Sequence, residues 1–374
     1  MIKTVEIENF KSIHKMEISL KELNVLIGQN GAGKSNFISL FRFLERLVDQ
    51  RLSEYIFKSG GINHFLFNGV EYSDHIKVKV ELSPAKNRSN IYEFEIEVDS
   101  SGEKYQFGLE RVGFWRKNQF PSPYTSVISP GNQESNIKKK KGDSGYDEKI
   151  AKYVYEYLKD LKVFHFNDSS ENAPLKLPQE IDDVYFFKNE AENIAPFLMH
   201  LSTSNPSTYN RIVETIRLVY PSFNDFELKE SPTSKGKVIL RWTEKGTDNI
   251  FTINQISDGT LRFICLATLL LQPGSSNAVP KTIIMDEPEL GLHPFAVNIL
   301  SELIKKAALE RQIIIATQSV TLVSHFEVED LIIVERNQEG ESIFLKKTVE
   351  DVKEWLDDFS LGELWENNFL GGRP

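Results

Sequence analysis

Apolar and polar positions at the start of the chain predict a strand, a turn and a helix in succession. Residues 2–8 alternate between apolar and charged side chains, and residues 23–27 form a short apolar run that ends at Gly28. Both patterns are typical of strands. From Ser35 onward, apolar side chains recur at helical spacing, at Phe37, Leu40, Phe41, Leu44, Leu47 and Val48. This order of elements favours a nucleotide-binding fold.

The middle of the chain changes pattern twice. Residues 75–115 alternate strictly, with a turn at Ser100, and predict an antiparallel meander. Residues 117–149 are rich in Ser, Pro, Asn, Gly and Lys, which predicts a mobile loop. The four lysines at 138–141 could contact phosphates, but a short run of like charge is more often a solvated loop, and we favour that interpretation. They support no nucleic-acid assignment by themselves.

The second half predicts helices and then a parallel sheet. A helix over 150–161 leads into a strand over 161–166, and helices follow over 193–220, closed by Pro221. Short apolar strands then recur, separated by helical patterns, at 282–286, 312–317 and 330–334. Strands that alternate with helices favour a parallel sheet with crossover helices.

Composition narrows the class of protein. The chain has 374 residues, 40% hydrophobic and 26% charged, which fits one or two globular domains. Its longest apolar run, 263–271, is far shorter than the roughly 18 residues of a membrane helix. Charges near Met1 and a single cysteine, Cys265, predict a cytoplasmic protein without a membrane span or disulfides. A net charge of −10 disfavours coating of nucleic acid by charge alone.

The strongest motif is the glycine-rich turn between the predicted strand and helix. Residues 28–35 fit the pattern GxxxxGK[ST]. Backbone N–H groups of such a loop face phosphate oxygens, Lys34 reaches the β- and γ-phosphates, and the Ser35 hydroxyl binds Mg²⁺. A chance match is expected in roughly one chain of this length in a hundred. The expected nucleotide contacts are Asn30, Gly31, Ala32, Gly33, Lys34, Ser35 and Asn36.

Two adjacent acids end the predicted strand at 282–286. Open α/β sheets bind ligands at the carboxyl ends of their strands. We expect Asp286 to hold Mg²⁺, directly or through water, and Glu287 to orient or deprotonate an attacking water. The alternative is that these acids merely begin a loop after a buried strand.

A third motif opens an apolar helix. Ser257 is a good N-cap residue, and Gly259 lets a phosphate approach the backbone. The alternative is an ordinary capped helix of the core. Its place shortly before the paired acids favours the functional reading, so the further expected nucleotide contacts are Ser257, Asp258 and Gly259.

Together, these motifs resemble the ABC-like ATPases, and within them the RecF/SMC-type heads and bacterial AAA-family ATPases often found in phage-defence operons. The resemblance covers nearly the whole chain: Val5–Ser12, the Walker A loop at 28–35, the signature-like Ser257-Asp-Gly-Thr, the Walker B acids, Leu290–Pro294 and 361–374. It implies ATP and Mg²⁺ as cofactors. It also implies that the signature of one subunit caps the γ-phosphate held by the Walker motifs of another.

The sequence departs from the family pattern at three places. Asp258 stands where the signature usually has a glycine, and Gln318 stands where many relatives have a switch histidine. Gln318 can orient water but cannot change charge. No clear Q-loop glutamine is present, and by order Asn167 takes its place. Lys11 resembles a family residue that reaches the nucleotide, but it also fits a plain surface lysine.

The resemblance implies an α/β fold: an ABC-type ATPase head with a parallel core sheet, an antiparallel β lobe and a helical insertion. We expect an N-terminal lobe at 1–166, a helical insertion at 167–225 and a C-terminal lobe at 226–374. Central helices replace the coiled coil of SMC proteins, because no sustained heptad pattern is present.

The expected function is an ATP-hydrolysing switch that closes as a head-to-head homodimer, or within a higher oligomer, and controls a separate effector or nuclease protein in antiphage defence. Two alternatives stay open: a RecF-like DNA-binding ATPase in repair, and a nucleotide-dependent scaffold with little turnover. No membrane partner is expected. We also expect no nuclease within this chain, because no paired aspartates follow the strand at 330–334 as a Toprim metal site requires.

Overall fold

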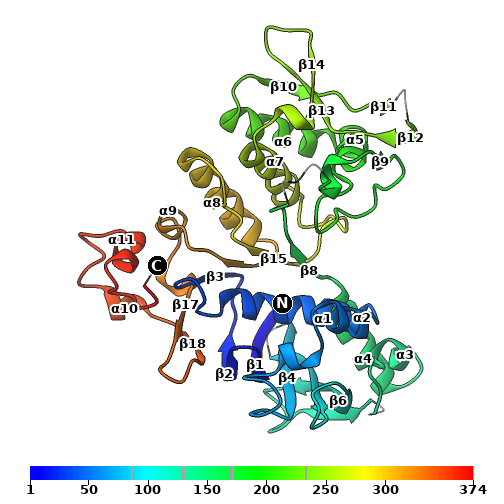
Figure 1. The fold of residues 1–374 in the computed structure, drawn as a ribbon, viewed down its shortest axis with the longest axis vertical. Helices are drawn as coiled ribbons and strands as arrows, with labels where there is room; N and C mark the ends of the chain where they lie inside the picture. The colour runs from blue at the N-terminus through cyan, green and yellow to red at the C-terminus, as the bar shows by residue number, and fades with distance from the viewer. Residues whose placement is uncertain (86, 129–130, 169, 171, 232–233, 374) are drawn as a thin grey trace. The chain divides into compact units, whose positions relative to one another are not determined.

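The computed structural model describes residues 1–85, 87–128, 131–168, 170, 172–231 and 234–373 (Figure 1). The chain forms two compact units. The first unit comprises Met1–Lys162 with Glu327–Pro374, and the second unit comprises Val163–Phe326. The three-part division expected from the sequence stays a prediction.

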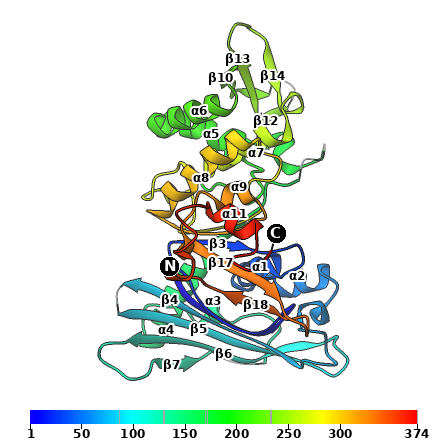
Figure 2. The same cartoon turned by 90° about the vertical axis from the view of Figure 1, so that its left-hand side faces the viewer.

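A broad antiparallel sheet forms one layer of the first unit (Figure 2). Apolar side chains alternate along its long strands, so one face of the sheet is buried. This confirms the predicted meander and extends it on both sides. In spatial order the strands are β2 (Ile13–Ser19), β1 (Ile2–Phe10), β4 (His75–Ala85), β5 (Arg88–Val98), β6 (Tyr105–Arg116) and β7 (Tyr124–Val127).

The predicted strand, turn and helix are also present in the first unit. β3 (Leu23–Ile27) pairs in parallel with β17 (Leu331–Arg336), which pairs antiparallel with β18 (Ser342–Leu345). α1 (Lys34–Val48) follows β3, and its Phe43 contacts the rings of Phe10 and Phe94 from the antiparallel sheet. An aromatic cluster therefore joins the helix after the phosphate-binding motif to the meander.

The remaining elements of the first unit are helices. The segment after β17 packs back onto it, because the Trp365 indole donates to the Gly372 carbonyl at 2.5 Å and the Gly372 N–H donates to Glu335 at 2.5 Å. These elements are α2 (Leu52–Lys58), η1 (Ile62–Phe65), α3 (Ile137–Lys140), α4 (Tyr146–Lys159), η4 (Val328–Asp330), α10 (Val349–Val352) and α11 (Leu361–Glu366). β8 (Leu161–Phe164) lies where the chain passes into the second unit.

The predicted mobile loop at 117–149 is wrong for the residues described there, because β7 and α3 interrupt it. A buried carboxylate explains the order. Glu110 on β6 accepts hydrogen bonds from the Tyr92 hydroxyl at 2.7 Å, from the Ser135 hydroxyl, and from the Asn136 N–H at 3.0 Å. An acid buried in this way stays in place only when donors surround it, so the polar segment is drawn inward. Residues 129–130 lie outside the described part of the chain.

The second unit combines a parallel strand pair with helices. β15 (Thr282–Asp286) and β16 (Gln312–Ala316) pair in parallel from Thr282 opposite Gln312 to Asp286 opposite Ala316. Figure 1 shows α6 and α7 running side by side, and α8 follows β15. The helices are α5 (Ile194–Ser204), α6 (Pro206–Val219), α7 (Asp258–Leu270), α8 (Pro294–Ala308) and α9 (Val320–Val323), with η2 (Pro174–Lys176) and η3 (Ile253–Gln255).

Two small antiparallel sheets in this unit were not predicted. Their strands hold two to five residues and carry many polar side chains, so they show little alternation. One sheet has the order β10 (Phe223–Phe226), β13 (Arg241–Glu244) and β14 (Ile250–Thr252), and the other has β11 (Glu230–Ser231), β12 (Ser234–Val238) and β9 (Gln179–Glu180). The predicted helices of 193–220 are confirmed as α5 and α6.

The Glu110 network generates a stability prediction. Glu110→Ala removes the acceptor of three buried donors and should lower the free energy of unfolding by about 3 kcal/mol. Glu97→Ala, at an exposed position of the neighbouring strand β5, should change it by less than about 0.5 kcal/mol. Urea denaturation of both variants measures the difference, and equal stabilities would contradict the role given to Glu110.

Candidate phosphate-binding loop and catalytic carboxylates

The loop from Gly28 to Ser35 joins β3 to α1, and its three glycines all adopt positive φ. A Cβ atom at Gly28 would lie 2.1 Å from the Val334 carbonyl oxygen, and one at Gly33 would lie 2.0 Å from Ser342 Oγ. At Gly31, with φ 78°, no described atom lies within 4 Å of that position. Contacts inside the protein therefore require two of the glycines, whereas Gly31 faces open space and needs glycine for its backbone angle.

Lys34 lies inside this loop. Its Nζ donates to the carbonyls of Gly28 at 2.5 Å and Gln29 at 3.1 Å, and the side chain is buried. Helix α1 begins at Lys34, and its N-cap Gly33 provides no side-chain acceptor for the first N–H groups. Such a helix terminus attracts anions, because its N–H groups and its dipole both favour negative charge. Gly31 and Ser35 are exposed, while Ala32 and Gly33 are buried.

A chain of hydroxyl contacts supports the loop from behind. Ser342 Oγ, on β18, donates to the Ala32 carbonyl at 2.6 Å and lies 2.7 Å from Ser12 Oγ. Asn36 Nδ2 donates to Ser12 Oγ at 2.6 Å. Ser12 was part of the resemblance, but the role of Ser342 was missed because nothing near it in the sequence marks it.

Lys11 precedes this chain of contacts. Its Nζ lies 5.3 Å from the centre of the Phe65 ring, a cation–π geometry, and its backbone φ is 51°. Burial, and secondly the charge of Arg42, lower the pKa of Lys11. The expected contact between Lys11 and nucleotide stays a prediction.

In the second unit, the loops after β15 and β16 bring two expected catalytic residues together. Gln318 Nε2 donates to Glu287 Oε1 at 2.6 Å. Glu287 has a left-handed backbone, φ 48°, and its N–H donates to the Ala316 carbonyl at 2.8 Å. Asp286 Oδ1 is buried with no hydrogen-bond partner among the described protein atoms. A buried acceptor of this kind suits a cation or a cation's water ligand.

The signature-like residues open α7, also in the second unit. Ser257 Oγ accepts from the Thr260 N–H at 3.2 Å, which confirms the expected N-cap. Asp258 forms an ion pair with Lys176 at 3.5 Å. A Cβ atom at Gly259 would lie 2.2 Å from the Gly291 carbonyl oxygen, so the unit itself requires glycine there.

Residues 23–324 match the family described as "AAA domain, putative AbiEii toxin, Type IV TA system". The chain belongs to this AAA-domain family. The match contains both Walker-type segments and the signature-like helix, and it confirms the resemblance to ABC-like ATPases of defence type.

Comparison with single proteins supports the same relationship. The chain is 23% identical to the Old nuclease of Escherichia phage P2, and the alignment covers 94% of this chain and 62% of that protein. The chain thus spans less than two thirds of that relative's length. Among the described residues, no helix is long and apolar enough to cross a membrane.

Solved structures show the fold. An SMC head bound to the C-winged helix domain of ScpA superposes with a TM-score of 0.59 at 15% identity, covering 94% of this chain and 99% of that one. An SMC head with an extended coiled coil, bound to the C-terminal domain of ScpA derived from Pyrococcus furiosus, gives 0.60 at 14% identity, covering 96% and 98%. The predicted α/β head is confirmed.

Arg262 on α7 is a residue of this AAA domain whose role was not predicted from the sequence. Its guanidinium donates to the carbonyls of Phe166 at 3.1 Å, Asn167 at 3.1 Å and Leu290 at 2.5 Å. Arg262 therefore ties the signature-like helix to the segment after β8 and to the loop after the Walker B acids. Asn167, the expected Q-loop substitute, contributes its backbone carbonyl to this contact.

A second overlooked residue is Glu289, the third acid after β15. Glu289 is half-buried, and the Thr317 hydroxyl donates to its Oε1. Its Oε2 is buried without a hydrogen-bond partner among the described protein atoms. Burial raises the pKa of Glu289, the Glu287 charge raises it further, and the Thr317 hydrogen bond partly opposes this.

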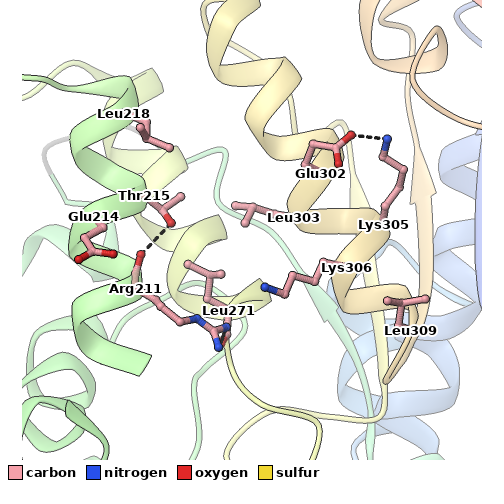
Figure 3. Close-up of a pocket in the computed structure, with 10 residues that line it drawn as sticks. All are labelled: Arg211, Glu214, Thr215, Leu218, Leu271, Glu302, Leu303, Lys305, Lys306 and Leu309. Atoms are coloured by element: carbon pink, nitrogen blue, oxygen red, sulfur yellow. Dashed lines mark hydrogen bonds and ion pairs between the residues drawn. The ribbon is translucent and has the colours of Figure 1, made fainter. Parts of the chain in front are cut away.

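An open groove of about 740 Å³ lies elsewhere in the second unit, along α6 and α8 (Figure 3). Leu218, Leu271, Leu303 and Leu309 provide its apolar lining, and Arg211 and Lys306 extend from opposite sides. None of the site residues expected from the sequence lines it. The groove is therefore separate from the candidate site.

The close approach of Gly259 to Gly291 predicts that Gly259→Ala lowers stability, whereas this substitution in a helix usually raises it. Replacing an ordinary helical glycine by alanine stabilises a helix by about 1 kcal/mol. Here the new Cβ must displace backbone, so Gly259→Ala should destabilise by about 2–3 kcal/mol. Thr260→Ala, one residue further in the same turn, serves as the control and should cost less than about 1 kcal/mol. A stabilised Gly259→Ala protein in denaturant titration would exclude the packing role.

Proposed function

We propose that this AAA-domain protein binds and hydrolyses ATP as a molecular switch, which closes head to head with a second copy and controls a separate effector in antiphage defence. The observation that carries the proposal is the Glu287–Gln318 pair, which joins a carboxylate to an amide at the carboxyl ends of two parallel strands. A phosphate-binding loop in the same chain supports it.

Different residues are proposed to bind the phosphates and the Mg²⁺ during phosphoryl transfer to water. The N–H groups at the start of α1 and the Lys34 ammonium bind phosphate oxygens, in place of the loop carbonyls that now accept from Lys34. Ser35 and Asp286 are the proposed Mg²⁺ ligands, through a hydroxyl and a carboxylate oxygen. Bound Mg²⁺ neutralises charge that develops on the transferred phosphoryl group.

Glu287 is the proposed base for the attacking water. One of its oxygens accepts from Gln318, which fixes the carboxylate plane and leaves the second oxygen for the water. Gln318 cannot take up a proton, so Glu287 itself must accept it. The amide therefore orients the base.

The signature-like residues are proposed to act on the partner's nucleotide. Ser257 already caps α7, so the helix N-terminus presents N–H groups to an anion. Asp258 adds a negative charge at this terminus, which Lys176 partly offsets. Because of this charge, the signature should bind a phosphate less tightly than one with glycine at position 258. Closure of the proposed dimer on ATP should therefore be weaker and more reversible.

Several similarities support a partner protein and a defence role. The family description names a putative toxin of a toxin–antitoxin system, and the P2 relative is a nuclease of a phage. Since the chain spans 62% of that nuclease, we propose that the effector activity resides in another polypeptide or region. The SMC heads in the two structures are bound to domains of ScpA, which is a precedent for docking of a second protein on this fold.

The nuclease relative also keeps the DNA-binding alternative open. A RecF-like protein would show ATPase activity that DNA stimulates, with a steep loss of stimulation as salt rises. An effector switch would hydrolyse ATP independently of DNA. ATPase assays with and without duplex DNA at several salt concentrations separate the two.

Two substitutions should separate binding from hydrolysis. Lys34→Ala removes the phosphate-binding ammonium and should abolish ATP binding, whereas Glu287→Gln should keep ATP bound and remove hydrolysis. Fluorescent-nucleotide binding and phosphate release measure the two properties. Hydrolysis at the wild-type rate by Glu287→Gln would show that Glu287 is not the base.

If each active site combines residues of two subunits, two different inactive variants should restore activity when they are mixed. In a heterodimer of Lys34→Ala and Ser257→Arg subunits, one site carries both lesions and the other carries none, so up to about half of the wild-type activity should return if sites act independently. Each variant alone should be inactive. Native mass spectrometry verifies that heterodimers form, and a wild-type chain that hydrolyses ATP as a monomer, at a rate independent of protein concentration, would overturn the shared-site arrangement.

A further inference from the structure

Two hydrogen bonds join the loop after β15 to the loop after β16. Gln318 donates to Glu287, and its neighbour Thr317 donates to Glu289. The two acids lie on either side of Pro288, and the two donors are consecutive. The proposed base and its amide partner therefore lie beside a second acid–donor pair.

The Thr317 hydroxyl fixes the backbone on both sides of Gln318. Thr317 is fully buried; its Oγ1 donates to Glu289 and accepts from the Ser319 N–H at 2.9 Å. Ser319 Oγ in turn accepts from the Leu322 N–H at 3.1 Å and caps α9. A continuous series of hydrogen bonds thus runs from Glu289 through Thr317 and Ser319 to the start of α9. Gln318 is the residue between Thr317 and Ser319, so its backbone is held on both sides.

The acid loop is equally constrained. Glu287 keeps a left-handed backbone, which costs a non-glycine residue on the order of 1 kcal/mol and persists only where the surroundings impose it. The Leu290 N–H donates to the Glu287 carbonyl at 3.2 Å, and the Leu292 N–H donates to the Glu289 carbonyl at 3.0 Å. The backbone of Glu289 is therefore fixed, and its side chain gives Thr317 a fixed acceptor.

We propose that Glu289 is a positioning residue: through Thr317 it fixes the backbone that carries Gln318, and so sets the amide that orients the Glu287 carboxylate. This inference rests on the proposed ATPase function. The role assigned to Glu289 is positional, not chemical. The Glu289 carboxylate acts through the Thr317 hydroxyl and through its hydrogen bond with the Gln318 backbone.

Matched substitutions test the hydroxyl and the acceptor separately. Thr317→Val deletes the hydroxyl but keeps the volume, and Thr317→Ser restores it; Glu289→Leu deletes the acceptor, and Glu289→Gln restores a carbonyl acceptor. Because misplacement of a catalytic group by about 1 Å costs roughly 100-fold, Thr317→Val and Glu289→Leu should lower kcat about 10- to 100-fold. Thr317→Ser and Glu289→Gln should stay within about threefold of wild type, and fluorescent-ATP affinity should be unchanged throughout.

A double-mutant cycle tests whether the effect passes through Gln318. In the Gln318→Ala background, Thr317→Val should lower kcat by less than about twofold further, since residues that act through one another are not additive. An equal fold-loss with and without Gln318 would show that Thr317 acts by another route. A parallel loss of ATP affinity and thermal stability would show general damage and overturn the inference.

Hydrogen exchange gives a readout that does not need turnover. Thr317→Val removes the acceptor of the Ser319 N–H, so amides of residues 316–323 should exchange faster than in Thr317→Ser. If wild-type protein hydrolyses no ATP, the proposed function fails, and the exchange experiment alone decides whether Thr317 holds this loop. If wild type is active and Thr317→Val is as active as Thr317→Ser, only the positioning inference fails.

Discussion

The parallel pairing of β15 with β16 determines where the chemistry of the second unit lies. Because the strands run in register from Thr282 opposite Gln312 to Asp286 opposite Ala316, both strands end at the same edge of the sheet. Residues just beyond that edge must then meet. A shift of one residue would turn each side chain to the other face and separate Glu287 from Gln318.

In the first unit, packing determines the shape of the glycine-rich loop from Gly28 to Ser35. Gly28 and Gly33 lie against atoms of Val334 and Ser342, so packing against β17 and β18 shapes the loop. The result is an uncapped helix terminus and a lysine held by the loop's own carbonyls. Preorganisation of this kind reduces the ordering cost of binding an anion.

Local patterns predicted those parts of the protein whose chemistry is contained in a few consecutive residues. The strand, glycine turn and helix around Lys34, and the acids at the end of β15, are of this kind. Glu289 was missed because its partner Thr317 lies in the loop after another strand, and nothing in the sequence around Pro288 indicates that contact. Glu110 was missed for the same reason: alternation on β6 shows which face it occupies but not that Ser135 will cover it.

The contact between Ser12 and Ser342 spans 330 positions of sequence, and Ser342 also donates to the loop at Ala32. During synthesis the glycine-rich motif leaves the ribosome well before β18, because Ser342 follows Ala32 by 310 positions. Contacts at such separation form late, because they must first overcome the entropy of closing a long loop. A nascent chain therefore carries the glycine-rich motif long before Ser342 is available to support it, and the loop reaches its folded geometry only after β18 has been made.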